Sequence, residues 1–255
     1  MSSAILQIRD LHCHFGGLKA LDGVTFDVYA GRITGLIGPN GAGKTTAFNC
    51  ISGLVNKTSG SVVFNQFDIS SESTSGISNR GLVRTFQLAR GCPRMTVFEH
   101  LMLYAPSQQG EGFISGLFKP TAVRLQEARL REEAYAMARR LKLDHVIDNL
   151  VTDISGGQKK LLEIGRALMA KPKLLLLDEP MAGVNPTLVE QIAQQLESIQ
   201  LEGVSIVLIE HEMALIEKLC DEVVVMVQGK FFTRGNFAEV TSHREVQEAY
   251  LGIIE

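Results

Sequence analysis

The fold of this chain is decided by Gly38-Pro39-Asn40-Gly41-Ala42-Gly43-Lys44-Thr45, which fills every fixed position of the pattern GxxxxGK[ST]. A short apolar run at 32–38 predicts a buried strand before this segment, and a helix is expected after it, over about 44–51. Glycines let several backbone N–H groups converge on one anion, and the positive end of a following helix points at the same place. The segment therefore predicts a polyphosphate-binding loop. In such a loop Lys44 reaches the β- and γ-phosphates and Thr45 offers a hydroxyl to Mg²⁺, and Thr46 completes the candidate nucleotide-binding set.

The composition is that of a globular protein with a sizeable core. The chain has 255 residues, 45% of them hydrophobic, and 25 basic residues against 28 acidic ones give a net charge of −3. This balance argues against a surface built to coat nucleic acid, so no nucleic-acid partner is expected. The longest apolar runs have the length of a strand, so we expect neither a signal peptide nor a membrane span. Any role at a membrane is then expected to come through a partner.

Cysteine and histidine spacing offers no clear metal site. The four cysteines lack CxxC spacing and predict neither a disulfide framework nor a zinc site. The triplet His12-Cys13-His14 invites a metal interpretation, but neighbours on a strand point to opposite faces, so at best His12 and His14 share one. No second pair of ligands is evident in the sequence. Strand packing is therefore the favoured interpretation of the triplet.

Strands and helices alternate through much of the chain. Strands are expected at 4–8, 24–29, 61–65, 173–178, 204–209 and 222–227, and helices at 159–169, 187–200 and 213–220. The apolar strands imply a parallel sheet covered on both faces, with ligands at the carboxyl ends of its strands. Residues 95–143 break this pattern with a charged amphipathic helix at 124–143, whose apolar positions are Leu125, Ala128, Ala134, Met137, Ala138 and Leu141. That block predicts a helical subdomain inserted into an α/β core.

Two carboxylates follow the apolar run at 174–177. Asp178 is placed to bind Mg²⁺, and Glu179 is placed to polarise an attacking water. Alone, this run would more often be a strand that meets a solvated turn. Together with the phosphate loop it predicts a site that hydrolyses a nucleoside triphosphate.

The segment Ile154-Ser155-Gly156-Gly157-Gln158 predicts a second anion site, at the start of another helix. By itself it would be a Ser-capped helix after a glycine turn. In its order and spacing before Asp178, the chain resembles the nucleotide-binding subunits of ABC transporters over essentially its whole length. Ile154 stands where the family has Leu, which conserves volume.

The resemblance implies a P-loop NTPase (RecA-like) α/β core with a parallel sheet, an N-terminal antiparallel β-subdomain and an inserted α-helical subdomain. The expected single domain, 1–255, comprises a core with its β-subdomain at 4–87 and 160–240, a helical subdomain at 88–159 and a tail at 241–255. The resemblance further implies that the second anion site binds the ATP held by an opposite subunit, so that two chains enclose two nucleotides.

Three more residues take roles from the resemblance. Phe15 stands where the family stacks an aromatic ring on adenine, Gln87 matches the glutamine that contacts Mg²⁺ or water, and His211 matches the histidine that contacts the γ-phosphate. One position departs from the common pattern, because Asn185 stands where these ATPases usually carry Asp. Asn keeps the hydrogen-bonding capacity but loses the charge.

The segments at 84–100, 181–186 and 244–252 are similar to the corresponding segments of ATPases that serve uptake of branched-chain or other neutral amino acids. This implies two transmembrane permease subunits, a second ATPase subunit that is either a paralogue or the same chain, and indirectly an extracytoplasmic solute-binding protein. The expected location is the cytoplasmic face of the plasma (inner) membrane. Alternatives are an ATPase for another solute such as urea, lipid or lipopolysaccharide, and a non-transport ABC ATPase. A kinase or GTPase would leave Ser155 and His211 unexplained.

Overall fold

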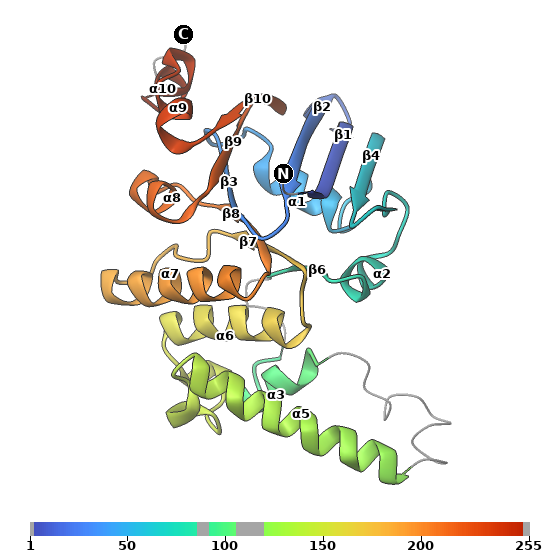
Figure 1. Ribbon diagram of the computed structural model, residues 1–255, viewed down its shortest axis with the longest axis vertical. Coiled ribbons are helices and arrows are strands. Elements are labelled where there is room, and N and C mark those ends of the chain that lie inside the picture. The colour runs from blue at the N-terminus through green and yellow to red at the C-terminus, as the bar shows by residue number, and fades with distance from the viewer. Residues whose placement is uncertain (1–2, 86–91, 106–119, 252–255) are drawn as a thin grey trace. The chain divides into compact units, whose positions relative to one another are not determined.

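The computed structural model describes residues 3–85, 92–105 and 120–251 (Figure 1). The chain divides into two compact units. The first comprises Met1–Arg84, Lys173–Ala182 and Ala193–Glu255, and the second comprises Thr85–Pro172 and Gly183–Ile192. The predicted boundaries of the core, the helical subdomain and the tail stay predictions.

A six-stranded sheet in the order β10-β9-β3-β8-β7-β6 forms the centre of the first unit. Its strands are β3 (Ile33–Ile37), β6 (Leu82–Arg84), β7 (Leu174–Asp178), β8 (Ser205–Ile209), β9 (Glu222–Val227) and β10 (Lys230–Gly235). All neighbouring pairs are parallel except β9 and β10, which pair antiparallel. Every residue of β3 and β8 is buried, as expected for strands covered on both faces. The α/β class with a parallel sheet is therefore confirmed.

A second, antiparallel sheet in the order β2-β1-β4-β5 lies in the same unit. It consists of β1 (Ala4–Phe15), β2 (Leu18–Tyr29), β4 (Ser59–Phe64) and β5 (Phe67–Asp68). The strands β1 and β2 have 12 residues each, at least twice the length that the sequence predicts. Irregular register between Ile8 and His12, with a left-handed backbone at Asp10, breaks the apolar alternation from which their lengths were predicted.

The helices of the first unit are α1 (Lys44–Ile51), α2 (Thr74–Asn79), α8 (Met213–Leu219), α9 (Phe237–Thr241) and α10 (Arg244–Leu251). Of these, α1 and α2 contribute buried residues to the apolar core that both sheets share. The side chain of Phe48, on α1, is fully buried with Phe64 of the antiparallel sheet and Leu36 of the parallel sheet. Because α1 begins at Lys44, burying this helix fixes the direction from which the phosphate loop enters it. The division between the units falls within α7 (Pro186–Leu201).

The second unit is helical. It contains α3 (Val97–Leu103), α5 (Pro120–Arg140), α6 (Gly156–Met169) and the 3₁₀ turns Asp144–Val146 and Val151–Asp153. Its core includes Leu130, Ala134 and Ala138, which follow one another at every fourth position of α5. The predicted apolar positions Leu125 and Ala128 are exposed instead, because they lie off that row. No described helix has the length and apolar character that crossing a membrane requires.

Candidate functional site: a nucleotide cavity and a second anion-binding helix start

The loop between β3 and α1 has a shape that only glycine allows at two of its positions. Gly38 has φ 153°, and a Cβ there would lie 2.1 Å from the carbonyl oxygen of Met226. Gly43 has φ 94°, and its Cβ would lie 2.6 Å from the carbonyl oxygen of Ala20. Both contacts are far closer than packed atoms tolerate, so any other residue would displace the loop.

Lys44 is held beside this loop by the loop's own carbonyls. Its side chain is 6% exposed, and Nζ donates to the carbonyl oxygens of Gly38 at 2.6 Å and Pro39 at 3.0 Å. Burial lowers the pKa of the ammonium group, whereas the nearby carboxylates of Glu179 and Asp178 raise it. A buried ammonium with acceptors on one side is well placed to receive anionic oxygens.

Asp178 ends β7 in an ion pair that the sequence analysis did not predict. Nη2 of Arg84 donates to Oδ2 of Asp178 at 3.0 Å, and Nη1 donates to Oδ1 of Asn49 on α1 at 2.5 Å. The Arg84 side chain is 8% exposed, and burial lowers its pKa against the pull of Asp178. Arg84 thus ties the carboxylate of β7 to the helix that follows the phosphate loop. The sequence pattern did not indicate this ion pair, because β6, the strand that carries Arg84, has only three residues.

Glu179 and His211 meet just beyond the carboxyl ends of β7 and β8. Nε2 of His211 lies 2.7 Å from Oε1 of Glu179. The backbone N–H of Glu179 donates to the carbonyl of Ile209 at 3.0 Å, and Glu179 has φ 50°, which turns its side chain out of the strand direction. The parallel pairing of the two strands brings together residues that are 32 positions apart.

Glu210 stabilises the turn that follows Glu179, a role that the sequence analysis missed. Its carboxylate is buried and accepts from the backbone N–H of Met181 at 2.9 Å. Burial raises the pKa of Glu210, and the backbone hydrogen bonds with Met181 and His211 oppose that rise. A glutamate at the end of an apolar strand gives no sign in the sequence that its side chain folds back inside.

One cavity of about 520 Å³ gathers most of the predicted nucleotide residues. Its lining includes Phe15, Asn40, Gly41, Ala42, Gly43, Lys44, Thr45, Thr46, Glu179 and His211. Phe15, at the end of β1, is 51% exposed, which leaves its ring available for stacking. The cavity is also lined by Leu18, Lys19, Ala20, Gln228 and Gly229, which the sequence analysis did not assign. Gln87 lies outside the described residues.

The second anion site predicted from the sequence lies in the other unit, at the start of α6. Oγ of Ser155 accepts from the N–H of Gln158 at 3.2 Å, and Oε1 of Gln158 accepts from the N–H of Ser155 at 2.8 Å. A Cβ on Gly157 would lie 1.8 Å from Leu188, so packing requires that glycine. A Cβ on Gly156 would meet nothing within 4 Å. Packing among the described residues therefore does not explain Gly156.

Asn185 has a local role that preserves one function of the expected Asp. Its Oδ1 accepts from the N–H of Leu188 at 3.0 Å at the start of α7. Asn and Asp are comparably good at such caps, so helix capping does not need the missing charge.

The oxygen donors near the loop fit Mg²⁺. Asp178 provides a carboxylate and Thr45 a hydroxyl, and Mg²⁺ prefers oxygen ligands and binds them together with water and substrate phosphates.

The ion pair between Arg84 and Asp178 yields the first testable prediction. Replacing Arg84 by Met leaves a largely buried carboxylate without its guanidinium and should lower the free energy of unfolding by about 3 kcal/mol. The control is Arg244→Met, which removes an exposed partner of Glu248 on α10 and should leave the unfolding midpoint nearly unchanged. Urea denaturation measures both. Equal effects of the two variants would contradict the structural role of Arg84.

Comparison with known proteins identifies the family. Residues 21–182 match the model of the ABC transporter family. A probable branched-chain amino acid transport ATP-binding protein LivG of Archaeoglobus fulgidus is 40% identical over 250 residues, which cover 97% of this chain and 95% of that protein. The high-affinity branched-chain amino acid transport ATP-binding protein LivG of Escherichia coli K12 is 33% identical over 253 residues, covering 99% of each chain.

Solved structures agree with this similarity. A nucleotide-free ATP-binding cassette from an ABC transporter superposes with a TM-score of 0.85 at 35% identity, covering 97% of this chain and 99% of its own. The ADP conformation of an ATP-binding cassette of an ABC transporter gives 0.84, also at 35% identity, covering 98% of this chain and 100% of its own. With the phosphate loop, the paired carboxylates and the second helix start in place, the chain belongs to the ABC transporter family and has the fold of its ATP-binding cassettes.

Proposed function

We propose that this chain binds ATP in the 520 Å³ cavity and hydrolyses it as the ATP-binding subunit of an ABC importer. The observation that supports this most directly is the lining of that cavity, which includes Phe15, the start of α1 at residues 43–45 and the Glu179–His211 pair. These residues offer a ring for the base, donors for the phosphates and a carboxylate for the attacking water.

The proposed chemistry starts with Lys44. The ammonium group exchanges the carbonyls of Gly38 and Pro39 for the β- and γ-phosphate oxygens of ATP. The carboxylate of Glu179 then orients and polarises the attacking water, and His211, 2.7 Å from that carboxylate, contacts the γ-phosphate. Phe15 stacks on the adenine ring.

The same proposal assigns the Mg²⁺ ligands. Thr45 and Asp178 hold the ion, together with Gln87, and Arg84 positions the Asp178 carboxylate for that task. An ion held by these residues would supply positive charge that stabilises the negative charge on the transferred phosphoryl group.

The start of α6 is proposed to complete the nucleotide site of a second ATPase subunit. Ser155, Gly156, Gly157 and Gln158 would bind the γ-phosphate of ATP held by the opposite chain. Gly156 supports this assignment, since a Cβ there would meet no described atom within 4 Å, which leaves the backbone at this helix start accessible to a ligand. Two chains would then enclose two nucleotides. The second subunit is a paralogue or another copy of this chain.

The transported solute is proposed from the relatives. The curated relatives of Archaeoglobus fulgidus and Escherichia coli are named as branched-chain amino acid transport ATP-binding proteins and align with this chain almost from end to end. We infer that this chain drives uptake of branched-chain or other neutral, hydrophobic amino acids. Its partners would be two permease subunits, fed by an extracytoplasmic solute-binding protein, and it would act at the cytoplasmic face of the inner membrane.

Replacing Glu179 by Gln tests the catalytic assignment. The amide keeps the shape of the side chain but cannot act as a base, so ATP should bind while its hydrolysis falls by at least about 100-fold. The variant should also accumulate as an ATP-bound closed dimer of ATPase subunits. The control is Glu217→Gln, which neutralises an exposed carboxylate on α8 and should leave turnover unchanged. Steady-state phosphate release and light scattering measure the two effects, and normal turnover in the Glu179 variant would refute the assignment.

Stimulation of ATPase activity by solute tests the transport assignment. In liposomes that hold the permeases, both ATPase subunits and an enclosed solute-binding protein, leucine, isoleucine or valine should raise the rate of ATP hydrolysis. A sugar and urea serve as control solutes, and a complex with the Glu179→Gln chain serves as the inactive control. Stimulation by a control solute without stimulation by any amino acid would overturn the amino-acid assignment while leaving the ATPase assignment intact.

A further inference from the structure

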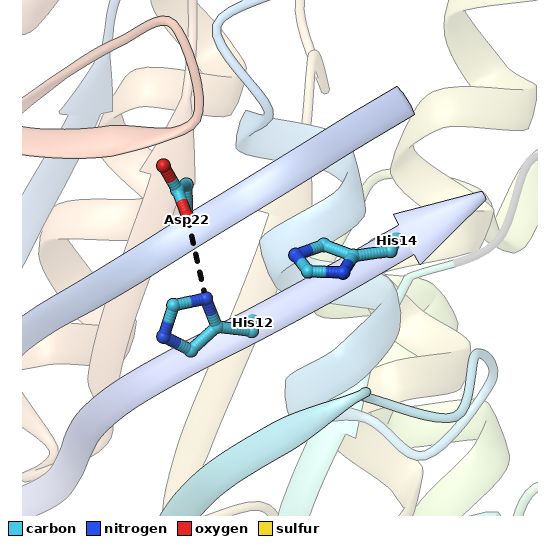
Figure 2. Close-up of side chains that lie close together, drawn as sticks. All are labelled: His12, His14 and Asp22. Atoms are coloured by element: carbon cyan, nitrogen blue, oxygen red, sulfur yellow. Dashed lines mark ion pairs between the residues drawn. The ribbon is translucent and has the colours of Figure 1, made fainter. Parts of the chain in front are cut away.

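Three potential metal ligands converge on the hairpin formed by β1 and β2. His12 and His14 come from β1 and Asp22 from β2, as Figure 2 shows, and their ligand atoms all lie within 4.8 Å of one another. The sequence analysis favoured strand packing for the two histidines, because no further ligand was evident beside them. The missing ligand comes from the neighbouring strand.

Strand pairing explains why these three side chains meet. Residues two apart on a strand point to the same face, which places His12 and His14 together, and their rings lie 5.9 Å apart between centroids. Asp22 is the register partner of His12 in the antiparallel pair of β1 and β2. Cross-strand partners on one face are close neighbours, so the carboxylate lies directly opposite the imidazole.

The separation of two of the ligand atoms matches that of atoms bound to one ion. Nδ1 of His12 lies 3.5 Å from Oδ1 of Asp22. Two ligands on a tetrahedral zinc ion, each about 2.0–2.1 Å from the metal, are about 3.4 Å apart. The pair is therefore at coordination distance before any ion binds. His14 is exposed, and one ligand atom of its ring lies within 4.8 Å of a ligand atom of each of the other two residues.

Asp10 orients the central histidine. Its Oδ1 lies 3.0 Å from Nε2 of His12. A proton on Nε2 would be donated to this carboxylate, which leaves the Nδ1 lone pair directed at Asp22. A carboxylate behind a ligating imidazole is the usual support of a histidine–metal bond. Asp10, which contacts His12, has a left-handed backbone and lies at the irregular part of β1.

Two lysines share Asp22 with this site. Nζ of Lys230 lies 3.3 Å from Oδ2 and Nζ of Lys19 lies 3.6 Å from Oδ1. The hydrogen bond with Lys230 lowers the pKa of Asp22, so the carboxylate is ionised at neutral pH. The two lysines stabilise the charged form of the Asp22 carboxylate, but they also compete with a metal cation for that carboxylate.

We propose that His12, His14 and Asp22 bind a divalent transition-metal ion of the zinc type. Two imidazoles and one carboxylate form a nitrogen-rich ligand set, which favours Zn²⁺ over Mg²⁺, and water fills the remaining positions. The site is separate from the Mg²⁺ ligands proposed for ATP hydrolysis. The bound ion would link β1 to β2 in the hairpin whose end carries Phe15, and would thereby raise the thermal stability of the chain.

Calorimetric titration of the full chain with Zn²⁺, in nucleotide-free buffer, tests the proposal. The wild type should bind one Zn²⁺ per chain at this site, and His12→Ala, His14→Ala and Asp22→Asn should each abolish that event. His243→Ala, which removes an exposed histidine elsewhere, should retain it. His211→Ala should retain it too, which separates this site from Glu179 and His211. Circular dichroism checks that each variant is folded.

Two further variants test the site without removing any of the three proposed metal ligands. Asp10→Asn should weaken Zn²⁺ binding by about 10- to 100-fold, as loss of a supporting carboxylate does elsewhere. Lys230→Met should strengthen it, because a competitor for Asp22 is removed. Binding of Co²⁺ should give a visible absorption band that is lost in Asp22→Asn. Absence of Zn²⁺ binding in the wild type, or binding that survives all three ligand variants, would overturn the proposal.

Discussion

A buried ammonium group beside a glycine-rich loop is the constraint on which the rest of the site depends. Lys44 is nearly inaccessible and hydrogen-bonded to the loop carbonyls, and the glycines at both ends of the loop abut backbone oxygens of β9 and β2. The loop therefore cannot move without disturbing both sheets of the first unit. That rigidity is what electrostatic catalysis requires, because the donors must be in place before charge develops.

The carboxylates opposite this loop owe their positions to the parallel sheet. Adjacent strands β6, β7 and β8 end at one edge, so Arg84 contacts Asp178, and His211 contacts Glu179, from distant parts of the chain. The start of α6 belongs to another unit and has no comparable partner for Gly156 within it. Its absent side chain becomes understandable if the missing neighbour is the nucleotide of a second subunit.

Contiguous motifs made the phosphate loop, the strand ending in Asp178 and the capped helix at Ser155 predictable from the sequence, since neighbouring residues determine those structures. Contacts set by tertiary pairing were not predictable in the same way. Arg84 sits on a strand of three residues, Glu210 folds back beneath a turn, and Asp22 faces His12 only through strand register. The apolar stripe of α5 was misplaced at Leu125 because spacing alone does not say which turn meets its neighbours.

The central claim is that one chain carries two complementary halves of a nucleotide site. ATP turnover by a Gly156→Glu chain, measured in the assembled transporter, tests it most directly, with Ala136→Glu on the exposed face of α5 as the control for added charge. Because a Cβ at position 156 meets no atom of the described residues within 4 Å, folding and ATP binding by the isolated subunit should be unchanged. Hydrolysis should be lost at the site that this α6 completes. The variant is placed at every position that this chain fills in the transporter. If both nucleotide sites of that transporter still hydrolyse ATP at the normal rate, the claim is wrong.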